Sequence, residues 1–189
     1  MTSNQKSVPQ ALNFLKRFIR SPRSIGSVAP SSPALVAAML DDVDWAKIAT
    51  VAELGAGTGV ITSWIDRLRP SESKFMCFEK HPKMHRTLCD RFPDVIMQQD
   101  AFQLKRLLQT KHLSGLDCVV CGLPLVNFPR GQRESLLSDI HASLNPGGFF
   151  IAFQYTRRLR PVLLATYEQI ECRFVWANLP PAYVFVCRK

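Results

Sequence analysis

Short apolar segments alternate with amphipathic segments along most of the chain. The expected strands are apolar on both faces and span residues 48–54, 75–79, 95–98, 116–121, 149–155, 172–176 and 183–187. The expected helices repeat apolar residues three or four positions apart and span residues 32–40, 60–68, 82–92, 101–110, 133–144 and 162–169. This alternation predicts an α/β sheet covered by helices on both faces. The last two strands have only a short connection, so we expect them to be antiparallel.

The 189 residues suit one domain with a full hydrophobic core, and no internal repeat interrupts them. A strong turn is expected at Asn145-Pro146-Gly147-Gly148. We place the domain at residues 31–189 and expect an amphipathic helix and a loop in residues 1–30. Its apolar residues recur at helical spacing, with cations elsewhere on the wheel: Leu12, Leu15, Phe18 and Ile19, and Lys16, Arg17 and Arg20.

The net charge of +9 is unevenly distributed. The first forty residues contain five lysines and arginines and no acid, and residues 153–167 contain Arg157, Arg158 and Arg160 and again no acid. Basic patches of this kind suit nucleic acid or an anionic membrane surface, although a solvated basic face is the simpler alternative. No apolar run approaches the ~20 residues that a membrane-spanning helix needs. The polar amino terminus does not read as a secretory signal.

Most of the six cysteines fall in apolar, strand-like segments. Without a secretory signal, buried free thiols and a cytoplasmic location are expected. Cys118 and Cys121 lie within one expected strand, where their side chains need not converge. His81 and His85 share a helix face but have no evident carboxylate or cysteine partner. We therefore predict no metal site.

The segment Glu53-Leu54-Gly55-Ala56-Gly57-Thr58-Gly59 lies between an expected strand and an expected helix. Glycines allow a sharp turn and a close approach of ligand to backbone, and the following helix offers unpaired amide groups. Glu79 closes the next strand, where nucleoside-binding sheets place an acid that accepts hydrogen bonds from ribose hydroxyls. The pair predicts a nucleoside-type cofactor site. The Gly-x-Gly-x-Gly spacing differs from the dinucleotide fingerprint, which makes a dinucleotide site the second choice.

Two further segments follow expected strands at the same edge of the sheet. Asp100, before Ala101, is placed to accept from an adenine amine or to cap a helix, and both roles are compatible. The loop that begins Gly122-Leu123 follows the fourth strand, near the switch in strand order where such sheets bind ligands. We expect methyl transfer at this loop if the cofactor is S-adenosylmethionine.

The glycine motif and Glu79 resemble class I S-adenosylmethionine-dependent methyltransferases. Four further segments look like those of the bacterial phospholipid N-methyltransferases, which methylate phosphatidylethanolamine. They are Ile25-Gly26-Ser27-Val28-Ala29-Pro30-Ser31-Ser32, Cys121-Gly122-Leu123-Pro124-Leu125, Phe153-Gln154-Tyr155 and Asn178-Leu179-Pro180-Pro181-Ala182. The resemblance implies a single-domain Rossmann-like fold with a seven-stranded, mostly parallel sheet and an antiparallel last strand. It also implies S-adenosyl-L-methionine as cofactor and a lipid headgroup amine as acceptor.

Residues are assigned to three roles, two of them supported by the resemblance and one inferred from position. The cofactor would contact Ser31, Ser32, Glu53, Gly55, Ala56, Gly57, Thr58, Gly59, Glu79, Lys80, Asp100, Ala101, Gly122 and Leu123. Tyr155 and Asn178 are candidates from position alone for orienting the acceptor amine. Leu12, Leu15, Lys16, Arg17, Phe18, Ile19 and Arg20 would dock reversibly on the inner face of the cell membrane, which makes the protein peripheral.

Three other functions fit parts of the sequence. An RNA adenine methyltransferase would explain the basic surface, but the Gly122-Leu123-Pro124-Leu125 loop lacks the asparagine and the aromatic residue that hold a flipped base. A methyltransferase for small water-soluble molecules, and a non-enzymatic protein that binds the cofactor and a membrane, are the remaining alternatives. Lipid N-methylation is the preferred hypothesis.

Overall fold

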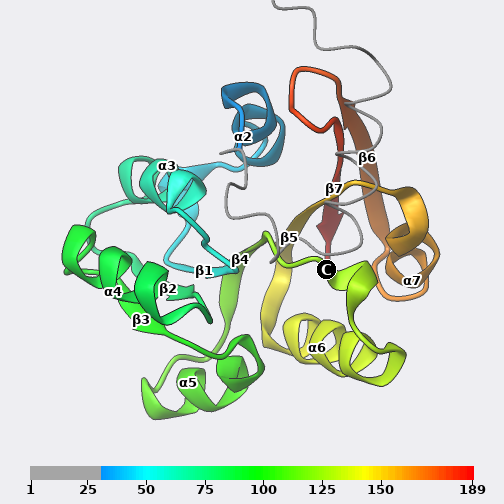
Figure 1. The fold of residues 1–189 in the computed structure, drawn as a ribbon. Coiled ribbons are helices and arrows are strands. Elements are labelled where there is room, and N and C mark those ends of the chain that lie inside the picture. Colours follow the sequence, from blue (N-terminus) through cyan, green and yellow to red (C-terminus); the bar gives the residue numbers. More distant parts are fainter. Residues whose placement is uncertain (1–30) are drawn as a thin grey trace, which may run out of the picture.

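One sheet of seven strands forms the centre of the computed structural model, which describes residues 31–189 (Figure 1). Its strand order is β3-β2-β1-β4-β5-β7-β6. The strands are β1 (Thr50–Leu54), β2 (Lys74–Phe78), β3 (Ile96–Gln98), β4 (Leu116–Cys121), β5 (Leu144–Gln154), β6 (Gln169–Val175) and β7 (Ala182–Arg188). The first five strands pair in parallel, and β7 is antiparallel to both β5 and β6. The α/β prediction and the antiparallel last strand are confirmed.

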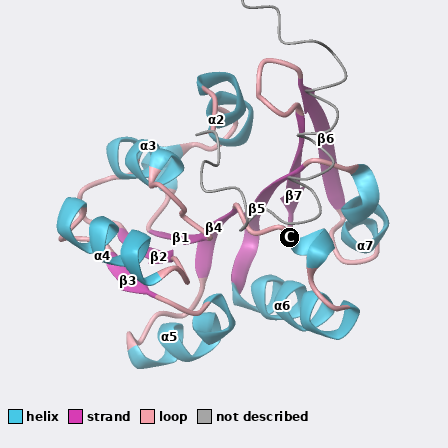
Figure 2. Cartoon of the chain, viewed as in Figure 1, coloured by secondary structure: helices cyan, strands magenta, loops and turns pink. Residues whose placement is uncertain are grey.

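Helices cover both faces of the sheet (Figure 2). Helices α2, α3 and α4 contribute to the apolar core on one face, and α5, α6 and α7 to the core on the other. The α-helices are α2 (Pro33–Leu40), α3 (Val60–Leu68), α4 (Pro82–Arg91), α5 (Leu104–Thr110), α6 (Arg130–Ser143) and α7 (Arg160–Leu164). Short 3₁₀ turns are η1 (Trp45–Lys47), η2 (Ala101–Gln103), η3 (Leu125–Asn127) and η4 (Arg157–Leu159).

The sequence of the central strand β4 does not alternate between apolar and polar residues, because both of its faces are buried. Cys118 and Val120 face the core beneath α2, α3 and α4, whereas Val119 and Cys121 face the opposite core. All four side chains are fully buried. A parallel strand with helices on both faces needs apolar residues at every position, and this is the pattern that predicted a strand at 116–121.

The structure corrects several predicted boundaries, of which three change an element most. Residues 145–148 form an irregularity within β5 rather than a free turn, because Gly147 and Gly148 hydrogen-bond the backbone of Lys189. The helix predicted at 101–110 divides into η2 and α5. The helix predicted at 162–169 is the shorter α7, which begins at Arg160 with Pro161 in its first turn, and Gln169 already belongs to β6.

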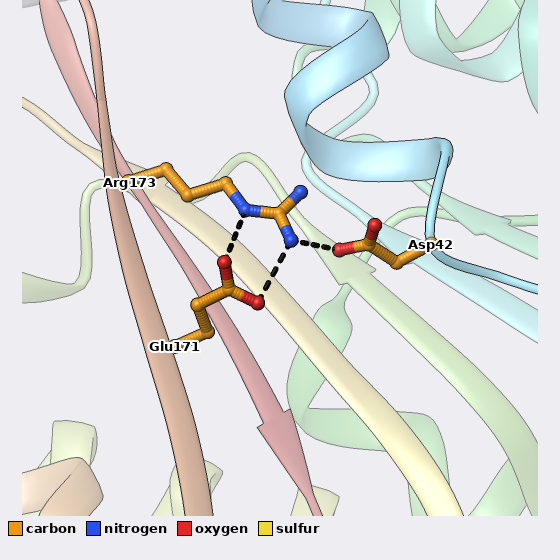
Figure 3. A network of polar contacts seen from close by, with 3 residues as sticks. All are labelled: Asp42, Glu171 and Arg173. Atoms are coloured by element: carbon orange, nitrogen blue, oxygen red, sulfur yellow. Dashed lines mark hydrogen bonds and ion pairs between the residues drawn. The ribbon is translucent and has the colours of Figure 1, made fainter.

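Strand β6 forms one edge of the sheet and is tied to the end of α2 by an ionic network (Figure 3). The Arg173 guanidinium donates to both carboxylate oxygens of Glu171, at 2.7 and 2.8 Å, and also to Asp42. Asp42 lies two residues beyond the end of α2, so the network joins residues far apart in the sequence. The two carboxylates raise the pKa of Arg173, with the hydrogen bonds to Glu171 as the main cause, and burial opposes part of this rise.

Candidate active site

The carboxyl ends of β1, β2, β4 and β5 meet at one edge of the sheet. Strand β1 pairs with β2 on one side and β4 on the other, because the chain runs outward from β1 through β2 to β3 and then crosses back to β4. Such a reversal opens a crevice outside the strand ends, where open α/β sheets bind ligands. The predicted site segments after these strands are therefore neighbours, as the sequence suggested.

The glycine turn after β1 is fixed by the end of β2. The backbone amides of Gly55 and Ala56 both donate to the Phe78 carbonyl oxygen, at 2.8 and 3.1 Å. Gly55, Gly57 and Gly59 have φ values of 83°, 57° and 80°, a region that residues with a side chain rarely adopt. The three glycines are therefore required by backbone conformation as well as by spacing.

The surroundings of the three glycines differ. A β-carbon on Gly55 would lie 2.7 Å from Leu123 Cδ2, and one on Gly59 would lie 2.5 Å from Leu88 Cδ2. A β-carbon on Gly57 would have no other heavy atom within 4 Å. The middle of the turn thus borders open space, which fits a cofactor lying against the backbone at this point.

Glu79 connects the glycine turn to the start of α4. Its Oε2 accepts from the Gly57 amide and its Oε1 from the His81 amide, both at 2.8 Å. These bonds hold a half-buried carboxylate beside the open part of the turn. A carboxylate oxygen has more than one lone-pair direction, so Glu79 keeps acceptor capacity for the two hydroxyls of a ribose. Lys80, the next predicted contact, is exposed.

Asp100 and Ala101 follow β3, the strand beyond β2 in the sheet. The Asp100 carboxylate accepts from the Phe102 amide at 3.0 Å and caps η2, as the capping alternative predicted. Its side chain is exposed, and its second oxygen keeps lone pairs for an adenine amine. The structural and cofactor roles are therefore compatible, and the second remains a prediction.

The loop after β4 packs directly against the glycine turn. The Gly122 amide donates to the Leu54 carbonyl at 2.8 Å, and a β-carbon on Gly122 would lie 2.7 Å from the Gly55 carbonyl oxygen. The buried Gln154 donates from Nε2 to the Leu123 carbonyl at 2.8 Å and fixes the loop from β5. Gly122 is thus needed for the two loops to approach each other.

Glu53 lies under the glycine turn with 1% of its surface exposed. The Cys77 thiol donates to its Oε2 at 3.7 Å, and burial raises the pKa of Glu53 to about 7. Hydrogen bonds from Thr62 and Cys77 lower this pKa, but they offset only part of the desolvation. A carboxyl group that titrates near neutral pH at the base of a ligand site responds strongly to a cationic ligand group.

Tyr155 directly follows β5 and is half-buried. Its ring contacts Phe153 edge-on, with the centroids 5.9 Å apart, and burial raises the pKa of Tyr155 to about 12. The phenol therefore stays protonated at neutral pH. It suits the predicted role of orienting an amine by hydrogen bonding and does not suit the role of a general base.

Asn178 is buried in the loop between β6 and β7. Its Oδ1 accepts from the Ser32 amide at 3.0 Å, and its Nδ2 donates to the Pro180 carbonyl at 2.7 Å. Ser32 caps α2 by accepting from the Leu35 amide, and Ser31 precedes it. These contacts assign Asn178 a positioning role between the loop and α2. Its proposed action on the substrate remains a prediction.

Two residues that brace the site were not singled out as site residues in the sequence. Gln154 was noted only as the middle of Phe153-Gln154-Tyr155, and Arg91 was not noted. Arg91 Nη1 donates to the Thr58 carbonyl at 2.9 Å, which ties α4 to the glycine turn. A buried glutamine at the end of an otherwise apolar strand is a signal for Gln154, whereas an exposed arginine in a helix gives none.

The predicted membrane-docking residues, Leu12 to Arg20, lie outside the described residues. Among residues 31–189, no group of three or more metal-binding side chains is found. No helix in this part of the chain combines the length and apolar character needed to cross a membrane.

Comparison with known proteins identifies a related enzyme of similar length. No protein-family model matches the sequence. The ornithine lipid N-methyltransferase of Singulisphaera acidiphila is 32% identical over 185 residues, which cover 93% of this chain and 94% of that protein.

Solved structures show the same fold at low sequence identity. The 1,6-didemethyltoxoflavin-N1-methyltransferase of Burkholderia thailandensis, determined with S-adenosylhomocysteine, matches with a TM-score of 0.66 at 16% identity over 100% of this chain and 93% of its own. The N-methyltransferase NodS of Bradyrhizobium japonicum, also with S-adenosylhomocysteine, matches with a TM-score of 0.65 at 12% identity over 95% and 98%. The site residues, the fold and the 32% sequence identity along almost the whole chain agree: the chain is a class I S-adenosylmethionine-dependent methyltransferase and belongs to the same N-methyltransferase family as the Singulisphaera enzyme.

Proposed function

We propose that this enzyme methylates the amine of a membrane-lipid headgroup at the membrane surface. The observation that carries the proposal is the 32% identity, along almost the whole of both chains, to an enzyme named for methylating a lipid on nitrogen. The sequence resemblance to phospholipid N-methyltransferases points to the same acceptor chemistry, a headgroup amine. Two headgroups are therefore candidates, phosphatidylethanolamine and an ornithine lipid.

The residues at the sheet edge fit S-adenosylmethionine. Glu79 would accept from the ribose hydroxyls, Asp100 from the adenine amine, and the open backbone at Gly57 would border the cofactor. When bound, the cofactor would supply a methyl group on a sulfonium: the lone pair of the acceptor nitrogen would form the N–C bond, and the electron pair of the S–C bond would stay on sulfur. The protein's share is then to align the acceptor nitrogen with the methyl carbon and to exclude water.

The acceptor amine must be neutral when it attacks, although an amine of lysine-like basicity is mostly protonated at neutral pH. A half-buried site disfavours the ammonium form and so lowers the pKa of the amine. The Tyr155 hydroxyl, protonated and next to the edge of β5, would accept an N–H hydrogen bond and hold the lone pair toward the cofactor. The methylammonium product would then release its proton to water.

The test is a methyl-transfer assay with labelled S-adenosylmethionine and vesicles that contain one candidate acceptor each. Phosphatidylethanolamine, an ornithine lipid, a water-soluble amine and an unmodified transfer RNA form the four arms. We expect label in one or both lipids and none in the soluble amine or the RNA. Label only in the soluble amine or in RNA would contradict the proposal, provided that cofactor binding is intact.

Lipid analysis of cells that express the protein gives an independent test. Cells expressing the wild-type chain should accumulate N-methylated headgroups, and mass spectrometry would identify the lipid and the number of methyl groups. Cells expressing Glu53→Ala are the matched control, because this change removes the buried carboxyl at the cofactor site. Identical lipid profiles for the two would leave the proposal without support.

A further inference from the structure

The loop between β6 and β7 presents two large apolar side chains to solvent. Trp176 is 79% exposed and Leu179 is 68% exposed. Strand β6 is parallel to β1, β4 and β5, because β7 is antiparallel to both β5 and β6. The loop that follows β6 therefore lies at the same edge of the sheet as the cofactor site, on the side of β5 away from the glycine turn.

An unbroken row of side chains leads from this loop to an arginine. The ring centroids of Trp176 and Phe174 are 4.4 Å apart, and those of Phe174 and Tyr183 are 4.6 Å apart. The Arg157 guanidinium lies 4.9 Å from the centroid of the Tyr183 ring. We call Trp176, Phe174, Tyr183 and Arg157 the aromatic row. It joins an exposed tryptophan to a cation within one continuous surface.

The aromatic row continues into a basic cavity of about 590 Å³. The cavity is lined by Arg157, Arg160, Pro161 and Cys172, with no acid among its lining residues. Glu171, the one acidic residue of β6, pairs with Arg173, which also donates to Asp42 near the end of α2 (Figure 3). Cys172 packs against the opposite core, beneath α5, α6 and α7. The two faces of β6 thus differ in charge, and the acid is on the face away from the cavity.

We propose that the aromatic row, Leu179 and the arginine-lined cavity form a membrane-docking surface that takes an anionic phospholipid bilayer. The proposal rests on the proposed function, because it explains how the cofactor edge would be turned toward a lipid acceptor. Tryptophan and tyrosine favour the headgroup level of a bilayer, and leucine favours its acyl chains. Arginine forms bidentate hydrogen bonds with phosphate, which suits Arg157 and Arg160 to lipid headgroups.

Single-stranded RNA is the other polyanion that aromatic and arginine side chains can bind, through stacking and phosphate contacts. The exposed leucine favours the bilayer, since an aliphatic side chain gives a base no aromatic face to stack on. RNA binding is therefore an outcome of the test rather than part of the proposal.

The test measures binding of the full chain to vesicles of phosphatidylcholine alone and of phosphatidylcholine with phosphatidylglycerol. The double substitution Trp176→Ser and Leu179→Ser should lower the affinity for anionic vesicles about tenfold or more, because two apolar side chains no longer leave water. Substituting Arg157→Gln and Arg160→Gln should cost about fivefold per arginine on anionic vesicles and little on neutral ones. Arg157→Lys with Arg160→Lys should recover most of that loss.

The chain offers a matched control on α3, where the Arg67 guanidinium lies 5.9 Å from the ring centre of Trp64, a side chain that is 41% exposed. Substituting Trp64→Ser and Arg67→Gln removes the same chemical groups outside the proposed surface and should leave vesicle affinity unchanged. Brominated lipids should quench Trp176 fluorescence, and this part of the quenching should vanish in Trp176→Phe. Circular dichroism and cofactor affinity would show that each variant is folded.

Four results would overturn the proposal: no binding of the wild-type chain to anionic vesicles, equal losses for the control pair, no quenching of Trp176, or quenching by single-stranded RNA alone. The proposed function is tested separately with acceptor lipid dispersed in detergent micelles. Methylation in micelles without docking by this surface would overturn only the docking surface. Docking without methylation of any lipid would overturn only the proposed function.

Discussion

At the scale of single residues, Gly57 and Gly59 should respond differently to the same substitution. Gly57→Ala places a methyl group into open space, so its cost in folding is mainly that of a left-handed alanine, about 1 kcal/mol. The methyl group would intrude where the cofactor is expected, so cofactor affinity should fall at least about tenfold. Gly59→Ala drives its methyl group into Leu88 and should lower the free energy of unfolding by several times more.

Calorimetric titration of S-adenosylmethionine and thermal unfolding, measured on both glycine variants, would separate these effects. Equal loss of stability in both variants would contradict the different surroundings that the structure gives them. Full cofactor affinity in Gly57→Ala would show that the cofactor does not border this part of the turn.

Glu53 should make the stability of the cofactor-free enzyme depend on pH. Its pKa is about 7 in the folded state, above the ordinary value of 4.5, so the folded state binds more protons between these values. Stability conferred by the protonated form is therefore complete below about pH 4.5 and is lost as the pH rises through 7. The free energy of unfolding falls by about 3 kcal/mol at most, because each unit of difference between the folded and unfolded pKa values contributes about 1.4 kcal/mol.

Glu53→Gln should remove this pH dependence, because an amide does not titrate. Urea unfolding at pH 5 and pH 8 would measure it, and we expect the variant to be more stable than the wild type at pH 8. Its cofactor affinity should fall, since the buried carboxylate is lost. A wild-type stability that rises from pH 5 to pH 8, with that rise unchanged in the variant, would contradict the assigned pKa.

At the scale of elements, the apolar pattern predicted the sheet well because each buried strand needs apolar residues on both faces. Helix α3 was predicted with its observed ends, Val60 and Leu68, since a glycine turn precedes the first and charged residues lie on both sides of the second. The bend at residues 145–148 was predicted, but its inclusion in β5 depends on Lys189, a partner far away in sequence. Local patterns cannot supply such partners, which is also why Arg91 and the positioning contacts of Asn178 were missed.

Asn178 should contribute more to the attachment of α2 than the ion pairs of Arg173 do. Asn178→Ala leaves the amide of Ser32 and the buried carbonyl of Pro180 without their partner, at a cost of about 2 kcal/mol. Arg173→Gln breaks ion pairs whose acidic partners are partly exposed, which typically contributes about 1 kcal/mol or less. Chemical denaturation of both variants checks this order.

The same Asn178 variant tests its predicted role on the substrate. If Asn178 only positions the loop and α2, kcat at a temperature where the variant is fully folded should change little, while the melting temperature falls. A large fall in kcat with unchanged KM for the cofactor would instead support direct action on the acceptor amine.

At the scale of the whole molecule, the uneven charge should decide which membranes the enzyme uses. The first forty residues contain five cations and no acid, and Lys16, Arg17 and Arg20 belong to the segment that we expect to dock. Substituting these three by glutamine should lower affinity for anionic vesicles by about fivefold per charge. The loss should shrink at high salt, because screening weakens the attraction in the wild type as well.

Vesicle binding at low and high salt, with methyl transfer to micellar lipid as the parallel assay, checks this prediction. Lys83, Arg86 and Lys111 are exposed cations of the described chain outside both proposed docking elements, so their glutamine substitutions form a control of equal charge. An equal loss of affinity in the control would mean that net charge alone drives binding. A selective loss in the Lys16, Arg17 and Arg20 variant, with micellar activity retained, would locate docking in the amino-terminal segment and leave the cofactor edge free to act on lipid.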